Sequence, residues 1–167
     1  MESCGMLLRA NRDADARVTL GVFRRAIQQT AGRDYSAEQV AVWASHDIDA
    51  LDEWTAQRGA QITQVAELDG AVVGFTDVDD NGYIDMLYVD PAFGRRGVAT
   101  ALLRWAISTA HGRGATELST HARVTARAIF EANGFAVVEK QHPMHRGVTF
   151  TNYRMIRPCD ALPEPRS

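Results

Sequence analysis

The apolar positions of this chain follow two periods. Residues that recur every three or four positions indicate helices, and short apolar or alternating runs indicate strands. The predicted strands are Met6–Ala10, Ile62–Leu68, Ala71–Val78, Tyr83–Val89, Thr116–Ala122, Phe135–His142 and Val148–Ile156. The predicted helices are Asp13–Ala31, a second helix that opens at Ser36, Gly97–His111 and Arg123–Asn133.

Turn signals refine this division. The pairs Asp69-Gly70 and Asn81-Gly82 favour two-residue hairpin turns, so the three strands from Ile62 to Val89 should form an antiparallel meander. Ser36 with Gln39 three residues later is a capping-box pattern at a helix start. Residues 45–59 are acidic and poorly periodic, so no element is predicted for them.

The length of 167 residues suits one domain with a full hydrophobic core. Strands and helices that alternate along one chain predict a single-domain α/β fold with a mixed central sheet of about seven strands, flanked by about four helices. The domain should span residues 1–157. The proline-rich residues 158–167 are expected to form a disordered tail.

Composition and charge exclude several classes of protein. The net charge is -3, whereas nucleic-acid binding needs a basic surplus, so no nucleic-acid partner is expected. No apolar run approaches the roughly 18 residues of a membrane span, and the N-terminus lacks the pattern of a signal peptide. A cytoplasmic protein without a membrane partner is therefore expected. Two cysteines at opposite ends predict no disulfide framework and no zinc site.

The stretch DPAFGRRGVATALL, Asp90–Leu103, joins a predicted strand to a predicted helix. A helix start presents unpaired N–H groups and the positive end of the helix dipole, so it attracts anions. Gly94 and Gly97 allow a bulky anion to approach the main chain, and Arg95 and Arg96 add positive charge. The stretch has the features of a diphosphate-binding loop.

Two common phosphate loops do not fit this stretch. A Walker loop needs Gly-Lys-Ser/Thr, which the chain lacks. A dinucleotide fingerprint belongs to an early parallel βαβ unit, whereas this loop follows a late antiparallel meander. On spacing alone, a plain strand-to-helix turn remains as good an interpretation as an anion site.

These residues resemble the acetyl-CoA-binding segment of the GCN5-related N-acetyltransferases (GNAT). Val89-Asp90-Pro91 and the stretch RGVATALL, 96–103, carry the likeness, although Gly94 stands where the family has Arg or Gln. The stretch ARAIFEANGF, 126–135, and the order of elements extend it over nearly the whole chain. Three further stretches resemble the bacterial YafP-like subgroup: DYSAEQVAVWA (34–44), GYIDMLYVDP (82–91) and GVTFTNYRM (147–155).

The resemblance implies acetyl-CoA as cofactor. In the family the pantetheine arm pairs with a strand edge, here at Leu87–Val89, and the diphosphate binds the amides of residues 95–100. Arg123 and Phe130, in the next helical segment, would flank the thiol and the pantetheine. The residues to which the resemblance assigns the cofactor are Leu87, Tyr88, Val89, Arg95, Arg96, Gly97, Val98, Ala99, Thr100, Arg123 and Phe130.

The implied reaction is direct attack of an amine on the thioester, which needs a base for the ammonium and an acid for the thiolate. A backbone N–H at Leu87–Val89 would hold the oxyanion. The family often places its acid, a tyrosine, at the position of Phe130, which cannot donate a proton. Tyr153 and Tyr88 are the substitutes, and for Tyr88 sheet packing is the stronger interpretation.

Three residues are candidates for the base. Tyr83 and Asp85 share one face of a strand, with Tyr88 on the other, and Tyr83 stands where the family often has a glutamate. His121 ends the next strand, and histidine titrates near neutrality. A solvated strand aspartate and a hydrogen-bonded strand-end histidine remain the alternatives.

The acceptor and the assembly are less constrained. Acidic residues around the Asn81-Gly82 turn would attract a cationic acceptor or only form a solvated turn: Asp77, Asp79, Asp80 and Asp85. Tyr35, Trp43 and Trp54 are candidates for the acceptor wall, with core packing as the alternative for Trp43. The expected function is acetyl transfer to a primary amine of a small molecule or peptide. The alternative is an acyl-CoA-binding sensor or interaction module without turnover, and a homodimer is compatible with either.

Overall fold

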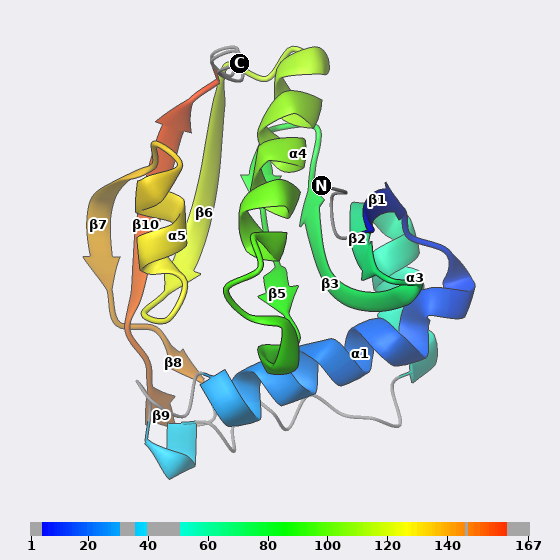
Figure 1. The fold of residues 1–167 in the computed structure, drawn as a ribbon. Coiled ribbons are helices and arrows are strands. Elements are labelled where there is room, and N and C mark those ends of the chain that lie inside the picture. Colours follow the sequence, from blue (N-terminus) through cyan, green and yellow to red (C-terminus); the bar gives the residue numbers. More distant parts are fainter. Residues whose placement is uncertain (1–4, 31–35, 40–50, 146, 160–167) are drawn as a thin grey trace.

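The computed structural model describes residues 5–30, 36–39, 51–145 and 147–159 (Figure 1). The Ser36 capping box is confirmed, because the Gln39 N–H donates to Ser36 Oγ at 3.1 Å and the Ser36 N–H donates to Gln39 Oε1 at 2.9 Å. Tyr35 and Trp43 lie outside the described residues, as does most of the helix predicted after Ser36.

The strands form two four-stranded sheets that lie side by side and one short hairpin. The first sheet has the order β1-β2-β3-β5, and the second has the order β4-β6-β10-β7. Their strands are β1 (Met6–Ala10), β2 (Ile62–Leu68), β3 (Ala71–Val78), β4 (Tyr83–Ile84), β5 (Leu87–Val89), β6 (Glu117–Arg123), β7 (Ala136–Gln141) and β10 (Asn152–Pro158). The hairpin pairs β8 (Met144–His145) with β9 (Val148–Thr149).

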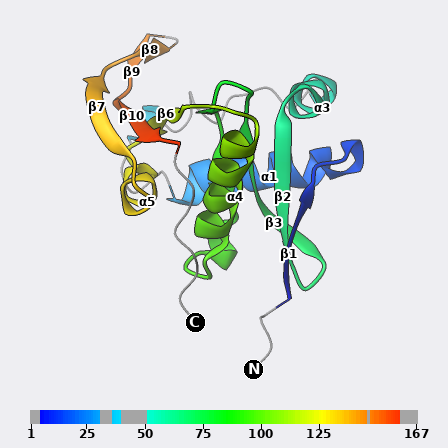
Figure 2. The same cartoon turned by 90° about the horizontal axis from the view of Figure 1, so that it is seen from above.

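Helices cover both faces of the first sheet, as the two views show (Figures 1 and 2). On one face, α1 (Ala16–Arg25) and α3 (Leu51–Ala60) pack on Val65 and Phe75. On the other, α4 (Val98–Gly112) packs on Ala66 and Val73 and extends over the second sheet. The short α5 (Arg127–Ala132) covers β6 and β10 on the α4 side. None of the helices described is long and apolar enough to span a membrane.

Several boundaries differ from the sequence-based expectation. The helix predicted from Arg123 begins at Arg127, because β6 continues through Arg123. The helix predicted from Asp13 begins with a 3-10 turn and ends in a π-helical turn, Ala26–Thr30. α3 lies in the segment for which no element was predicted. Pro158 ends β10 and Cys159 is buried, so the first two residues of the predicted tail belong to the fold, and residues 160–167 lie outside the described part.

The strand predicted from Tyr83 to Val89 is broken at Asp85 and Met86, and this break divides the sheet. β4 pairs in parallel with β6, whereas β5 pairs antiparallel with β3. The two ladders therefore diverge from one continuous stretch of chain. The break also shifts the alternation of side chains, because Ile84 and Leu87 both pack in the core beneath α4.

Candidate active site

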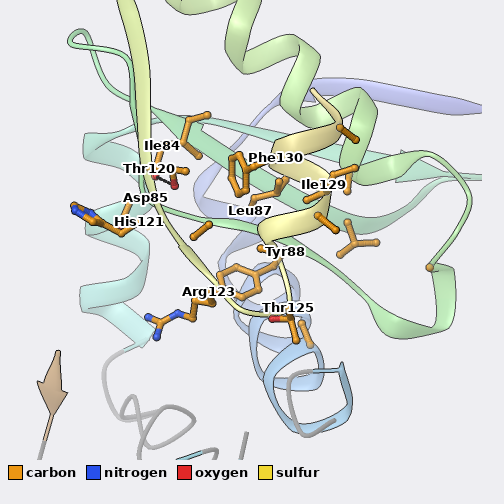
Figure 3. A pocket seen from close by; sticks show the side chains of 18 of the residues that line it. Ile84, Asp85, Leu87, Tyr88, Thr120, His121, Arg123, Thr125, Ile129 and Phe130 are labelled. Carbon is orange, nitrogen blue, oxygen red and sulfur yellow. Dashed lines mark hydrogen bonds between the residues drawn. The ribbon is translucent and has the colours of Figure 1, made fainter. Parts of the chain in front are cut away.

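A cleft of about 1180 Å³ opens where the two sheets separate. Strands β4 and β5 line one side of it, and β6 and α5 line the other. One end reaches the loop before α4, at Gly94 and Arg95, and the other end reaches Tyr83, Asp85 and His121. Figure 3 shows that α5 directs Phe130 into this space.

The loop before α4 has the geometry of an anion cradle. Gly97 has φ = 79°, and the space that a Cβ on it would enter is open to 4 Å. In the described part of the chain, the N–H groups of Val98, Ala99 and Thr100 have no protein acceptor, and no side chain caps the helix. Because a helix of this kind binds anions at its start, the cradle fits the diphosphate of acetyl-CoA.

The side chains of the cradle have different positions. Arg95 lines the cleft, with a left-handed φ of 63°. The Arg96 guanidinium lies 5.6 Å from the centre of the Phe93 ring. Val98 is buried in the core, so only its main chain can meet a ligand there. Ala99 also lines the cleft, and Thr100 is half-buried.

An ion pair anchors the start of this loop. Asp90 accepts the N–H of Ala92 at 3.0 Å and is bound by Arg25 through Nε at 3.0 Å and Nη2 at 2.8 Å. Arg25 is the last residue of α1, and the following residue, Ala26, lines the cleft. No local sequence pattern indicates this pair, because its partners are 65 positions apart.

Strand β5 supplies an open edge. It is the last strand of its sheet in the described structure, and Leu87, Tyr88 and Val89 all line the cleft. Peptide-like ligands can bind such an edge as an added strand, so the edge fits a pantetheine arm. The Tyr88 ring packs edge-on against Phe23, with ring centres 5.1 Å apart, which agrees with the packing role expected for it.

At the far end of the cleft, Tyr83 and His121 form a hydrogen-bonded pair. The Tyr83 hydroxyl lies 3.0 Å from His121 Nδ1. Burial, followed by the neighbouring Asp85 carboxylate, raises the pKa of Tyr83 to about 12, and the Arg123 charge acts in the opposite direction. The phenol therefore stays protonated at neutral pH, and it donates to His121 Nδ1 in the tautomer in which this nitrogen carries no proton. Asp85 is exposed beside the pair.

The other candidates are divided between two faces of the second sheet. Arg123 shares the His121 face of β6, whereas Phe130 lies across the strand on the α5 side (Figure 3). Phe130 is 2% exposed and packs edge-on against Phe135, with ring centres 5.1 Å apart. Tyr153 packs on the α5 side too, with the Arg127 guanidinium 4.6 Å from its ring centre, and does not line the cleft.

The acidic residues near the Asn81-Gly82 turn have separate structural partners. Asp79 Oδ1 accepts the N–H groups of Asn81 and Tyr83, each at 2.9 Å, and Asp80 pairs with Arg113 at 2.8 Å. Asp77 is fully buried. Of the four, only Asp85 lines the cleft.

Two interpretations from the sequence are corrected by these positions. Tyr88 was expected on the strand face opposite Asp85, yet the break places Met86 and Tyr88 together in the core beneath α1. Trp54 was a candidate for the acceptor wall, but it is 6% exposed, packs on Phe23 and Phe75, and does not line the cleft.

Comparisons with known proteins agree with this geometry. Residues 31–157 match the family model described as an acetyltransferase (GNAT) domain. The chain is 36% identical over 148 residues to the uncharacterized N-acetyltransferase YafP of Escherichia coli (strain K12), covering 89% of this chain and 93% of YafP.

Solved structures share the fold. A GCN5-related N-acetyltransferase from Rhodopseudomonas palustris is 32% identical, with a TM-score of 0.88 over 95% of this chain and 98% of that one. YncA from Salmonella typhimurium, solved with its cofactor acetyl-CoA, is 20% identical, with a TM-score of 0.74 over 98% of this chain and 99% of that one. The predicted fold class and the resemblance to the YafP-like subgroup are confirmed.

Proposed function

The chain belongs to the GNAT family of acetyltransferases and is an acetyl-CoA-dependent acyltransferase, and we propose that it acetylates a primary amine of a small molecule or a peptide. The observation that carries this proposal is one continuous cleft. It joins the cradle at Gly94, Arg95 and Ala99 to the polar group of Tyr83, Asp85 and His121.

The cradle and the open edge of β5 would hold the cofactor. When bound, acetyl-CoA supplies the thioester that an amine attacks directly. The N–H groups of residues 95–100 would contact the diphosphate, and a main-chain N–H of Leu87–Val89 would hold the oxyanion. Support comes from the open space beside Gly97 and from the unpaired amides at the start of α4.

Tyr83 and His121 would remove the proton from the acceptor. An alkylammonium with a pKa near 10.4 must first become a neutral amine, at a free-energy cost of about 4–5 kcal/mol at pH 7. The amine proton passes to Tyr83 Oη while the Tyr83 proton passes to His121 Nδ1, along the 3.0 Å hydrogen bond. His121 is then the base, and Tyr83 relays the proton.

Asp85 would hold the acceptor ammonium. It is exposed in the cleft, next to the Tyr83–His121 pair, and the three acidic residues near it have other structural roles. One carboxylate favours an acceptor with a single ammonium group near the cleft. Tyr153 is not assigned to the reaction, because it lies on the α5 side of β10.

Thermal unfolding with acetyl-CoA is the first test, with NAD and ATP as controls. A ligand at about 100 times its Kd adds roughly 2.7 kcal/mol to the free energy of unfolding, which should raise the Tm by several degrees. We expect a shift with acetyl-CoA alone. No shift would remove the cradle from the proposal.

Release of free thiol in a screen of primary amines is the second test. Thiol release that depends on an amine supports acetyl transfer. A thermal shift without thiol release for any amine would instead favour an acyl-CoA-binding module, the alternative that Phe130 in place of a tyrosine allows.

A further inference from the structure

Asp77, on β3, is a buried carboxylate that binds the main chain at the break between β4 and β5. Its Oδ1 accepts the N–H of Asp85 at 2.9 Å and the N–H of Met86 at 3.2 Å. Its Oδ2 accepts from Arg58 Nη1 at 2.6 Å. The side chains of Asp77 and Arg58 are 1% and 3% exposed. This pair therefore lies in the interior, where an unpaired charge or N–H is strongly destabilising.

The main-chain N–H groups of Asp85 and Met86 do not take part in either strand pairing. The pairing of β4 with β6 ends at Ile84, and the pairing of β5 with β3 begins at Leu87. The main chain at the break bonds to side chains of β3 instead. In addition to the two N–H groups, the Met86 carbonyl accepts from Thr76 Oγ1 at 2.7 Å. Without an acceptor at Asp77, two N–H groups at the break would lack partners.

The break decides which way Asp85 points. In a regular strand from Tyr83 to Val89, Asp85 would share a face with Leu87 and Val89 and enter the core beneath α4. In the structure Ile84 takes that core position, and Asp85 is exposed in the cleft. The same break leaves β5 as the last strand of its sheet, with an open edge toward the cleft.

Arg58 connects Asp77, and through it the break, to a helix that does not line the cleft. It lies on α3, its guanidinium is 4.9 Å from the centre of the Trp54 ring, and its carbonyl accepts from Thr63 Oγ1 at 3.0 Å. Trp54 in turn donates from Nε1 to Thr19 Oγ1 of α1 at 3.0 Å. Burial raises the pKa of Asp77, and the Arg58 charge opposes that change.

We propose that Asp77 is a positioning residue for acetyl transfer, held by Arg58, that keeps the sheet open at Asp85 and Met86. Its carboxylate oxygen sets the edge that receives acetyl-CoA and turns Asp85 toward the acceptor. The part that concerns Asp85 rests on the proposed function. The part that concerns the β5 edge does not.

Two double variants test the oxygen of Asp77 that accepts hydrogen bonds from the N–H groups of Asp85 and Met86. Arg58→Met with Asp77→Asn removes both charges and keeps a side-chain oxygen for the two amides. Arg58→Met with Asp77→Leu removes both charges and the oxygen at nearly the same volume. We expect the double variant with Asp77→Asn, called the Asn pair, to bind acetyl-CoA within about threefold of the wild type, and we call the double variant with Asp77→Leu the Leu pair. The Leu pair should bind at least tenfold more weakly, with a lower kcat for the amine.

Thr19→Val is the matched control for stability. It removes the buried hydrogen bond to Trp54 without touching β4 or β5, so it should lower the Tm while acetyl-CoA affinity stays unchanged. Equal acetyl-CoA affinity in the two double variants, whether high or low, would overturn the proposal. Because acetyl-CoA affinity decides this test and kcat does not, the test remains decisive even if no amine is turned over.

Amide hydrogen exchange tests the wild type directly, should the Leu pair fail to fold. The N–H groups of Asp85 and Met86 lie outside both ladders, yet bonds to a buried carboxylate should protect them as strongly as the N–H groups of β3. Exchange as fast as in an exposed turn such as Asp69-Gly70 would show that Asp77 does not hold the break.

Discussion

The two ends of the cleft are built from different parts of the chain. The end proposed to hold the cofactor, called the cofactor end, consists of main chain: the N–H groups at the start of α4, the open turn at Gly97 and the edge of β5. The end proposed to hold the amine, called the acceptor end, consists of side chains, Tyr83 and Asp85 from one stretch of chain and His121 from β6.

This difference decides what each end can tolerate. A main-chain site depends on backbone conformation and is lost when a side chain fills it, whereas most substitutions nearby leave it intact. A side-chain site depends on particular atoms, such as the 3.0 Å contact between Tyr83 Oη and His121 Nδ1. Changes at the cofactor end should therefore abolish binding, and changes at the acceptor end should mainly alter rate.

Gly97→Glu should have the largest effect. The left-handed φ of 79° disfavours any side chain by about 1–2 kcal/mol, and the new carboxylate would enter the open space of the cradle. We expect the thermal shift with acetyl-CoA to disappear and the affinity to fall by more than about 100-fold, measured by calorimetry.

Gly97→Ala is the control for this variant. It carries the same backbone strain but adds only a methyl group to open space, so its Tm should fall by a few degrees while most of the affinity remains. Tight binding of acetyl-CoA by the Glu variant would place the diphosphate elsewhere.

His121→Ala should have the next largest effect, now on rate. Removal of a general base typically lowers kcat by about 100-fold or more. Acetyl-CoA affinity should stay within about twofold, because His121 lies at the end of the cleft opposite the cradle. Thiol release by the variant should be restored in part by added imidazole, which can replace the missing side chain. An unchanged kcat, or a loss that imidazole does not restore, would leave the base to another group.

The same division explains how far the sequence could predict the site. The backbone geometry of the candidate cradle was predictable because glycines, arginines and a helix start lie in one short stretch, Gly94–Thr100, whose conformation is local. Likewise, β2 and β3 could be bounded from their apolar runs and the Asp69-Gly70 turn. These features depend on neighbours in sequence.

The acceptor end depended on contacts between distant residues. The parallel pairing of β4 with β6 joins Tyr83 to Ser119 and so brings His121 near, and the break at Asp85 depends on Asp77 and Arg58. Strand alternation alone predicted the wrong face for Tyr88, because one irregular residue pair shifts every side chain beyond it.

Asp85→Asn should have a smaller effect, confined to acceptor binding. An exposed ion pair contributes about 0.2–1 kcal/mol, so KM for the amine should rise about two- to fivefold with little change in kcat. Steady-state kinetics at saturating acetyl-CoA would measure both constants. A fall in kcat of about 100-fold, with KM unchanged, would make Asp85 the base in place of His121.

Tyr83→Phe should change the alkaline stability of the protein. The pKa of Tyr83 is raised to about 12 in the folded state, from about 10 in an unfolded chain. Between these values the folded state binds more protons, so wild-type stability should fall as pH rises from 10 to 12. Urea unfolding should show a shallower fall in the variant, and equal slopes would mean that Tyr83 ionises normally.

Tyr153→Phe should have the smallest effect. It tests whether the acceptor end includes only residues on the same face of the second sheet as His121. Tyr153 lies on the α5 side of β10, where the Arg127 guanidinium stacks on its ring at 4.6 Å and can stack equally on phenylalanine. We expect kcat and KM within about twofold of the wild type and a Tm within a few degrees. A large loss of kcat with both KM values unchanged would mean that a proton reaches the cleft from the α5 side. The acceptor end would then include both faces of the second sheet, and Tyr153 would supply the hydroxyl that Phe130 lacks.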